Sequence, residues 1–118
     1  MAVKSGARAE EVAAAWLSNQ GFSLLAKNWR NRFAELDIIA EQLGTVHFIE
    51  VKYRAREAYG TGFDYVTRDK QRRLIRAAEM WMAQQKDSRD YQIDVISVGG
   101  DLGHPHLEYL PNCVELNQ

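Results

Sequence analysis

Residues 35–52, ELDIIAEQLGTVHFIEVK, contain two apolar runs on either side of Leu43-Gly44. The runs have the length of strands, and the break between them predicts a tight turn, so we expect a β-hairpin. A turn centred on Leu43-Gly44 places Asp37 directly opposite Glu50. Successive side chains of a strand point to opposite faces of the sheet. The charged side chains expected on one face are therefore Glu35, Asp37, Glu50 and Lys52.

The shared face combines two carboxylates with apolar neighbours. Carboxylates that lie side by side in an apolar sheet are costly unless a positive charge joins them. A hard divalent cation such as Mg²⁺ or Mn²⁺ prefers oxygen ligands and is the simplest partner for Asp37 and Glu50. Beside such an ion, Lys52 can orient or deprotonate a water molecule. The pattern therefore indicates metal-dependent cleavage of a phosphodiester.

Both faces of the predicted hairpin also carry apolar residues, because Ile39 and Phe48 share the face of the carboxylates. A sheet that is apolar on both faces needs a cover on each side, which predicts a three-layer α/β sandwich. The flanking pattern predicts the order α-β-β-β-α-β with an extra C-terminal strand. The expected elements are a helix over 5–20, a strand over 22–28, the hairpin strands 35–40 and 46–53, a helix from its N-cap Thr67 to about 86, strands over 91–98 and 107–110, and a further candidate strand over 114–116. A longer loop is expected over 54–66.

The composition is that of an ordinary globular domain, with 46% apolar and 26% charged residues in 118. This length predicts one domain over residues 1–118. No run approaches the roughly 20 apolar residues that cross a membrane, and the first residues carry no secretory-type apolar stretch, so we expect a cytoplasmic location. The lone Cys113 supports no internal disulfide, and no spacing of Cys and His suggests zinc.

The net charge of −1 hides an uneven distribution of the basic residues. Eleven of the fifteen fall into three clusters, namely Lys27, Arg30 and Arg32; Lys52, Arg54 and Arg56; and Arg68, Lys70, Arg72, Arg73 and Arg76. The third cluster opens a predicted helix, where the helix dipole disfavours positive charge, and this suggests an anionic partner. A basic surface around a carboxylate site suits a polyanionic substrate. The residues expected to contact nucleic acid, most simply DNA, are Lys70, Arg73, Arg76, Arg54 and Arg30.

Asp37 followed by Glu50-Val51-Lys52 across a hairpin resembles the D…E-x-K signature of the restriction-endonuclease-like nucleases. The chain further resembles the YraN family of uncharacterised bacterial proteins, related to archaeal-type Holliday-junction resolvases. The resemblance covers almost the whole chain. It rests on Gly6…Glu10, Asn28-Trp29-Arg30, 35–40, 48–54, Gly60, Val66-Thr67…Lys70, Trp81 and Ile93-Asp94-Val95.

The resemblance implies a restriction-endonuclease-like fold and a set of roles. Asp37, Glu50 and the backbone carbonyl of Val51 would ligate the metal. Lys52 would activate the attacking water or stabilise the phosphate, and Glu10 would reach the metal site from the first helix. Two positions depart from the family pattern. Ala34 stands where glycine is usual, and Gln92 stands where the third motif has an arginine.

Several alternatives stay open at this point. Lys52 can merely neutralise Glu35 across the strand pair, and Glu10 can be an ordinary solvated helix residue beside Glu11. His47 is expected to be packed or hydrogen-bonded on the opposite face, and Trp29 either packs in the core or stacks on a base.

Three functions compete for the chain as a whole. The first is a metal-dependent endonuclease that acts on structured or branched DNA, possible as a homodimer because two strands require two sites. The second is a nucleic-acid-binding module of nuclease fold without independent activity. The third is a small structural partner protein whose carboxylates form an incidental acidic patch.

Overall fold

The computed structural model describes residues 5–54 and 66–118, and within them the predicted order of elements is confirmed. Most of the loop expected over 54–66 lies outside the described residues. The elements are α1 (Ser5–Asn19), β1 (Ser23–Arg30), β2 (Glu35–Gln42), β3 (Thr45–Arg54), α2 (Arg68–Gln84), β4 (Tyr91–Gly99) and β5 (His106–Leu110).

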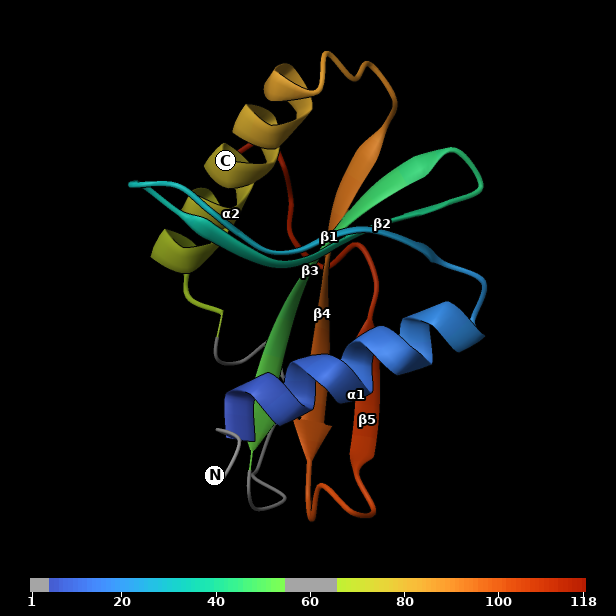
Figure 1. Ribbon diagram of the computed structural model, residues 1–118. Coiled ribbons are helices and arrows are strands. Elements are labelled where there is room, and N and C mark those ends of the chain that lie inside the picture. The colour runs from blue at the N-terminus through green and yellow to red at the C-terminus, as the bar shows by residue number, and fades with distance from the viewer. Residues whose placement is uncertain (1–4, 55–65) are drawn as a thin grey trace.

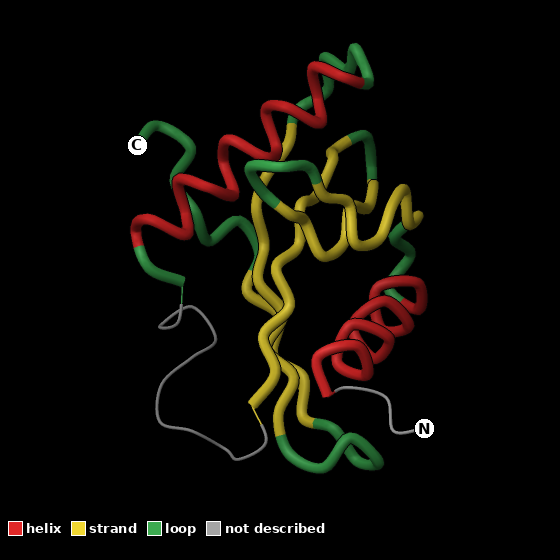
Figure 2. Tube along the Cα trace, turned by 60° about the vertical axis from the view of Figure 1, so that its left-hand side comes forward, coloured by secondary structure: helices red, strands yellow, loops and turns green. Residues whose placement is uncertain are grey.

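The strands form one mixed sheet in the order β1-β2-β3-β4-β5. β3 and β4 are parallel, and the other neighbouring pairs are antiparallel. A parallel pair needs a crossover connection, and α2 lies in it. α1 and α2 lie on opposite sides of the sheet, while β1 and β2 cross the direction of β3 to β5 steeply (Figures 1 and 2). The predicted α/β class with a helix layer on each face is thereby confirmed.

The hairpin of β2 and β3 has the predicted register, running from Ile38 opposite Ile49 to Gln42 opposite Thr45. Its turn consists of Leu43 and Gly44, with φ angles of 53° and 83°. Two positive φ angles in a two-residue turn match the right-handed twist of the strands. Gly44 adopts this conformation without steric cost, which explains why the sequence pattern located the turn correctly.

Each face of the sheet has its own apolar core. The core beneath α2 is built from that helix and from the facing side chains of β2, β3 and β4, including Leu36, Ile39, Phe48, Leu74 and Trp81. The core beneath α1 includes Ala13, Leu17, Ile38, Ile49 and Ile96. Burial of these side chains on both faces holds the central strands between the two helices.

Helix α2 begins where the sequence predicts. Thr67 is its N-cap, and the Thr67 hydroxyl accepts a hydrogen bond from the backbone N–H of Lys70 at 3.2 Å. The apolar stripe of α2 is buried, and this anchors the basic first turn of the helix above the sheet.

Two expected details were wrong. β1 begins at Ser23 and continues to Arg30, and Leu24 is 37% exposed because β1 is an edge strand with few neighbours. The candidate strand over 114–116 is absent from the described residues. This segment leaves the sheet after β5, and Val114 packs into the core beneath α2 instead.

Candidate active site

The strand β2 separates from β3 at Asp37. The pairing of the two strands ends at Ile38 and Ile49, and beyond it the Asp37 carboxylate accepts a hydrogen bond from the Val51 N–H at 2.8 Å. Alternation also breaks here, because Leu36 packs into the same core as Ile39. The Asp37 carboxylate thus takes the place of a backbone carbonyl as the acceptor for the Val51 N–H. It lies at the point where the two strands diverge.

The neighbouring strand β1 carries the matching irregularity. Asn28 has a φ of 53°, and it lies between the residues paired with Ile38 and with Leu36. A positive φ in a strand rotates the following side chains, and asparagine tolerates it better than most residues. The change of face at Asp37 is therefore shared by both strands.

Glu50 is the buried carboxylate of the site, 5% exposed in the middle of β3. Two ammonium groups approach the same oxygen of Glu50. The distance from Oε1 is 3.4 Å to Nζ of Lys52 and 3.6 Å to Nζ of Lys70. Lys70 reaches it from the first turn of α2, so the site joins two strands and one helix.

Asp37 has an unusual proton affinity. Burial is the main cause, and with the negative charge of Glu50 it raises the pKa of Asp37 to about 7. The hydrogen bond from Val51 and the charge of Lys70 lower the pKa of Asp37, but do not outweigh those effects. The lysines of the site therefore neutralise only part of the negative charge that acts on Asp37.

Glu10 lies on α1 and belongs to the same electrostatic group. Burial, followed by the charges of Glu35 and Glu50, raises the pKa of Glu10 against the opposing effect of Lys27. Its Oε1 atom is buried and has no hydrogen-bond partner in the part of the chain that the structure describes. A buried carboxylate oxygen without a partner is costly and calls for a cation or a proton.

We expect Asp37→Asn to stabilise the protein when no divalent cation is present. The pKa of Asp37 in the folded state lies above its ordinary 3.8, so ionisation destabilises the fold as pH rises from about 4 to about 7. The amide keeps an acceptor for the Val51 N–H and carries no charge. A pKa rise from 3.8 to about 7 corresponds to roughly 4 kcal/mol as an upper bound. Urea unfolding of both proteins at pH 8 and pH 4 measures the difference.

The gain in stability should be largest at pH 8 and nearly absent at pH 4. Asp90→Asn is the matched control, because Asp90 is an exposed carboxylate outside the site. A destabilised Asp37→Asn protein at pH 8 would show that the charge of Asp37 is already compensated.

Glu35 takes a different partner from the one considered for Lys52. Arg30 approaches Glu35 at 3.8 Å, with both side chains largely exposed, whereas Lys52 pairs with Glu50. An exposed pair of this kind contributes little to stability. Lys52 therefore lies beside the buried carboxylate of Glu50 and does not pair with Glu35.

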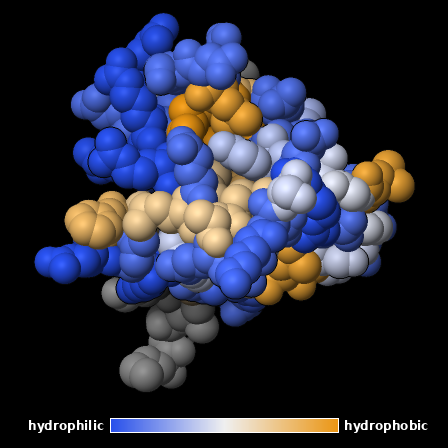
Figure 3. All heavy atoms as spheres, turned by 90° about the horizontal axis from the view of Figure 1, so that it is seen from above, coloured by the Kyte–Doolittle hydropathy of each residue, from blue (hydrophilic) through white to orange (hydrophobic). Residues whose placement is uncertain are grey.

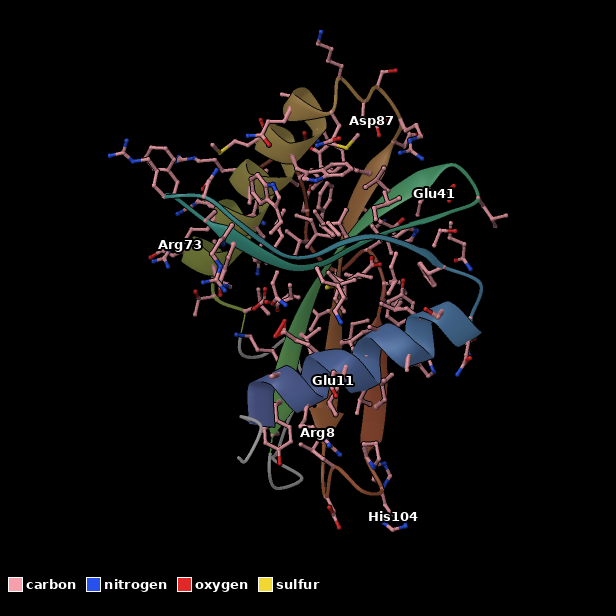
Figure 4. The ribbon with its side chains drawn as sticks, viewed as in Figure 1. Arg8, Glu11, Glu41, Arg73, Asp87 and His104 are labelled. Atoms are coloured by element: carbon pink, nitrogen blue, oxygen red, sulfur yellow. The ribbon has the colours of Figure 1, made fainter. Side chains whose placement is uncertain are left out.

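A pocket of about 360 Å³ adjoins this cluster, between the turn that joins β1 to β2 and the first turns of α2. We call it the basic pocket. Its charged and aromatic lining consists of Arg30, Arg32, Phe33, Glu35, Lys70 and Arg73. Figure 4 shows Arg73 on the side of α2 nearest that turn. Lys70 lines the pocket and also approaches Glu50 of the carboxylate site, so the two adjoin at this residue.

The other two residues expected to contact nucleic acid lie elsewhere. Arg76 lines a separate hollow of α2 with Arg72 and Glu79. Arg54 ends β3, and its carbonyl accepts a hydrogen bond from the Gly100 N–H at 3.1 Å. The structure therefore brings Lys70, Arg73 and Arg30 together and leaves Arg76 and Arg54 outside the basic pocket.

A second polar group is buried beneath α1. Asp94 is fully buried. Its carboxylate accepts hydrogen bonds from His47 Nδ1 at 2.7 Å and from the hydroxyl of Tyr109 at 2.7 Å. The side chain of Gln92 and the backbone N–H of Asn112 donate at 2.8 Å each. His47 is thus hydrogen-bonded on the face away from Glu50, as predicted. Gln92, which stands where the family pattern has an arginine, supports Asp94.

Two residues of the β1–β2 turn were missed by the sequence reasoning. Phe33 is 65% exposed and lines the basic pocket, while Asn31 accepts hydrogen bonds from the N–H groups of Phe33 and Ala34. The sequence contains a signal for Phe33, an aromatic residue within a basic turn. Trp29 packs against the core beneath α2.

The fold and the site define the class of the protein. It is a small α/β protein with a mixed sheet, and it has a charged site of carboxylates and two lysines where β2 leaves β3. A basic pocket adjoins that site. Residues 9–98 match the model of a family described as "Uncharacterised protein family UPF0102". The match spans more than half of the chain, so the chain belongs to the UPF0102 family. The predicted membership in the YraN family is thereby confirmed, while the wider placement among restriction-endonuclease-like nucleases stays a prediction.

Curated relatives match over most of their length. A UPF0102 protein of Nocardia farcinica is 40% identical over 107 residues, which cover 89% of this chain and 84% of the relative. A UPF0102 protein of Vibrio campbellii is 38% identical over 96 residues, 79% of each chain. One of Pseudomonas putida is 35% identical over 116 residues, 95% of this chain and 93% of the relative. These names state a family and no activity.

The described residues contain neither a side-chain group that would hold a metal ion alone nor a helix that could span a membrane. Within residues 5–54 and 66–118, no three side chains of His, Cys, Asp or Glu form a group that would hold a metal ion by themselves. No helix in the same ranges has the length and apolar character to cross a membrane.

Proposed function

We propose that this protein is a metal-dependent endonuclease of the restriction-endonuclease-like class that hydrolyses phosphodiester bonds in structured or branched DNA. The observation that supports this most is the convergence of Asp37, Glu50 and Lys52 where β2 leaves β3. The basic pocket beside this cluster offers positive charge to a polyanion. Fold and family alone do not carry the proposal, since neither states an activity.

The carboxylates fit a divalent cation. Burial and Glu50 raise the pKa of Asp37 to about 7, and Glu10 has a buried oxygen without a partner among the described residues. Both features fit the binding of a positive charge at this point. Mg²⁺ keeps several waters and is commonly held by only one or two carboxylates, so a group of three protein side chains is not required. Asp37, Glu50 and the carbonyl of Val51 would hold the ion, with Glu10 at its outer side.

The side chains divide the chemical work. A bound Mg²⁺ or Mn²⁺ would supply electrostatic stabilisation of the phosphate that is attacked. Lys52, held at 3.4 Å from Glu50, would orient the attacking water or donate to the developing charge on the phosphate oxygens. Asp37 holds the backbone of Val51 in place through its 2.8 Å hydrogen bond. Lys70 and Arg73 would bind the flanking backbone phosphates.

A symmetric dimer is part of the same proposal. A chain of 118 residues covers little of a DNA duplex, and the cutting of two strands requires two sites. Two copies related by a two-fold axis would present two carboxylate sites to the two strands.

One observation favours a second function, that of a nucleic-acid-binding module without activity of its own. Both Lys52 and Lys70 approach the same oxygen of Glu50. Glu50 is then neutralised from within the protein, and its need for a metal ion is reduced. Such a site would bind DNA through the basic pocket and leave the phosphodiester intact.

Cleavage of an end-labelled four-way DNA junction in Mg²⁺ tests the proposed function, with a linear duplex of the same arms beside it. We expect cutting of the junction by the wild type and none by Asp37→Asn, while the control Asp90→Asn cuts normally. The same products from wild type and Asp37→Asn would show that the cutting comes from another protein. Binding of the junction without cutting would favour the binding module.

A further inference from the structure

The basic pocket has the charge of an anion site. Four of its lining residues are cationic, namely Arg30, Arg32, Lys70 and Arg73, against the single carboxylate of Glu35. Its volume of about 360 Å³ falls within the range of roughly 300–1,000 Å³ that is usual for ligand sites. A surface with this excess of positive charge raises the local concentration of anions.

The pocket also has an aromatic wall that simple attraction for phosphate does not require. Phe33 is 65% exposed at the tip of the β1–β2 turn, and the guanidinium of Arg32 lies 5.5 Å from the centre of its ring. Seen from above, hydrophobic atoms project beside strongly hydrophilic ones over this turn (Figure 3). An exposed aromatic ring within a cationic groove is the combination on which single-stranded nucleic acids stack.

An exposed apolar side chain by itself is ordinary, and the other hairpin tip shows this. Leu43 is 97% exposed, and it does not line the basic pocket. Phe33 differs because it combines exposure with a place in the wall of a pocket that also contains Lys70. Lys70 in turn approaches Glu50 of the carboxylate site at 3.6 Å.

Hydrogen bonds within the turn that carries Phe33 tie its backbone together. The side-chain oxygen of Asn31 accepts hydrogen bonds from the N–H groups of Phe33 at 2.8 Å and of Ala34 at 2.9 Å. The backbone N–H of Asn31 donates to the carbonyl of Ala34 at 2.9 Å, and its amide contacts the sulfur of Met80 on α2 at 3.7 Å. A turn whose backbone is already tied loses less conformational freedom when a ligand stacks on its ring.

We infer that the basic pocket receives one unpaired nucleotide of a DNA strand, directly beside the carboxylate site. The base stacks on Phe33, and its phosphate pairs with Arg30, Lys70 or Arg73. This inference rests on the proposed contact with DNA and names the feature of the substrate that is recognised. Bases inside a duplex are already stacked on both faces and are not available to Phe33. The protein therefore prefers DNA with a single-stranded segment, such as a splayed arm or a flap, to a continuous duplex.

Fluorescence anisotropy with labelled oligonucleotides at about 50 mM salt, in EDTA, tests the preference without any need for cleavage. The probes are a splayed-arm DNA, a continuous duplex of the same composition and an RNA strand matching the single-stranded arm. We expect the wild type to bind the splayed arm more tightly than the duplex. Phe33→Ala weakens binding of the splayed arm by about tenfold and changes binding of the duplex little. Phe33→Trp restores the preference, because it keeps an aromatic face.

Two further variants separate stacking from charge. Leu43→Ala removes an exposed apolar side chain from the other hairpin tip, and we expect it to bind like the wild type. Arg73→Ala removes a phosphate contact, so it weakens binding of the splayed arm and of the duplex and lowers the salt dependence by about one phosphate contact. Unchanged thermal melting of Phe33→Ala excludes a loss of fold, and it is expected because the ring is mostly exposed.

Equal affinity of the wild type for splayed arm and duplex overturns the inference, as does a Phe33→Ala protein that keeps the preference. Tighter binding of the RNA strand than of the splayed-arm DNA overturns the assignment of the partner as DNA. A preference that depends on Phe33 in a protein that cuts no DNA upholds the inference while the proposed nuclease activity fails. The absence of binding to any probe overturns the inference together with the DNA contact on which it rests.

Discussion

Replacing Lys52 with methionine is expected to lower the rate of junction cleavage in Mg²⁺ by about 10²–10⁴-fold, the usual contribution of a positioned acid or base. Methionine keeps most of the length of the side chain and removes the ammonium group, which lies 3.4 Å from Glu50. Lys70 remains 3.6 Å from the same carboxylate, so Glu50 keeps one cationic neighbour. The loss should therefore appear in kcat, with the affinity for DNA little changed. Single-turnover cleavage at saturating protein measures it.

Lys70→Met provides the contrast within the same site. Lys70 lines the basic pocket, so its loss is expected to raise KM more than it lowers kcat. Lys86→Met, at an exposed lysine just beyond α2, is the control for the removal of a positive charge. Unchanged kcat in Lys52→Met would mean that Lys52 only neutralises Glu50 and takes no part in the chemistry.

Replacing Asp94 with alanine is expected to reduce the free energy of unfolding by about 3–5 kcal/mol, as for other broken buried charge networks. Four donors converge on this carboxylate, from His47, Gln92, Tyr109 and the backbone of Asn112. Alanine would leave them without their acceptor around a fully buried position. Urea unfolding measures the loss, and Asp90→Ala, at an exposed carboxylate, is expected to lose little.

The same network predicts how the difference depends on pH. Burial alone would raise the pKa of Asp94, but the hydrogen bonds from His47, Asn112, Gln92 and Tyr109 outweigh it and hold that pKa below the ordinary 3.8. A lowered pKa in the folded state stabilises the fold above about pH 4, and this contribution is lost as the carboxylate is protonated at lower pH. The difference in the free energy of unfolding between wild type and Asp94→Ala should become smaller below pH 4. A loss under about 1 kcal/mol at pH 7 would show that the donors find other partners.

The hairpin and its carboxylates could be predicted because local rules determine them. The two-residue turn at Leu43 and Gly44 sets the register as far as Ile38 and Ile49, one residue short of Asp37 and Glu50. The charge of Glu50 still acts on Asp37 beyond the paired region. Helix α2 was equally predictable, since Thr67 caps it and its apolar stripe has helical spacing.

The details of the site depend on distant parts of the chain, and the sequence pattern does not contain them. The loss of alternation at Asp37 accompanies the positive φ of Asn28 on a different strand. The approach of Lys70 to Glu50 depends on how α2 packs over the sheet after the crossover. The basic pocket likewise forms only when the β1–β2 turn, with Phe33, meets that helix.

The central claim is that Asp37 and Glu50 hold a divalent cation, and a calorimetric titration of Mg²⁺ into the wild type and Asp37→Asn tests it most directly. Mn²⁺ is titrated in parallel, and each titration is repeated with the splayed-arm DNA present. We expect the wild type to bind Mg²⁺ at millimolar concentrations, with the binding lost in Asp37→Asn and kept in Asp90→Asn. Absence of binding of either ion to the wild type, with or without DNA, would contradict the claim and leave the binding module as the function of this site.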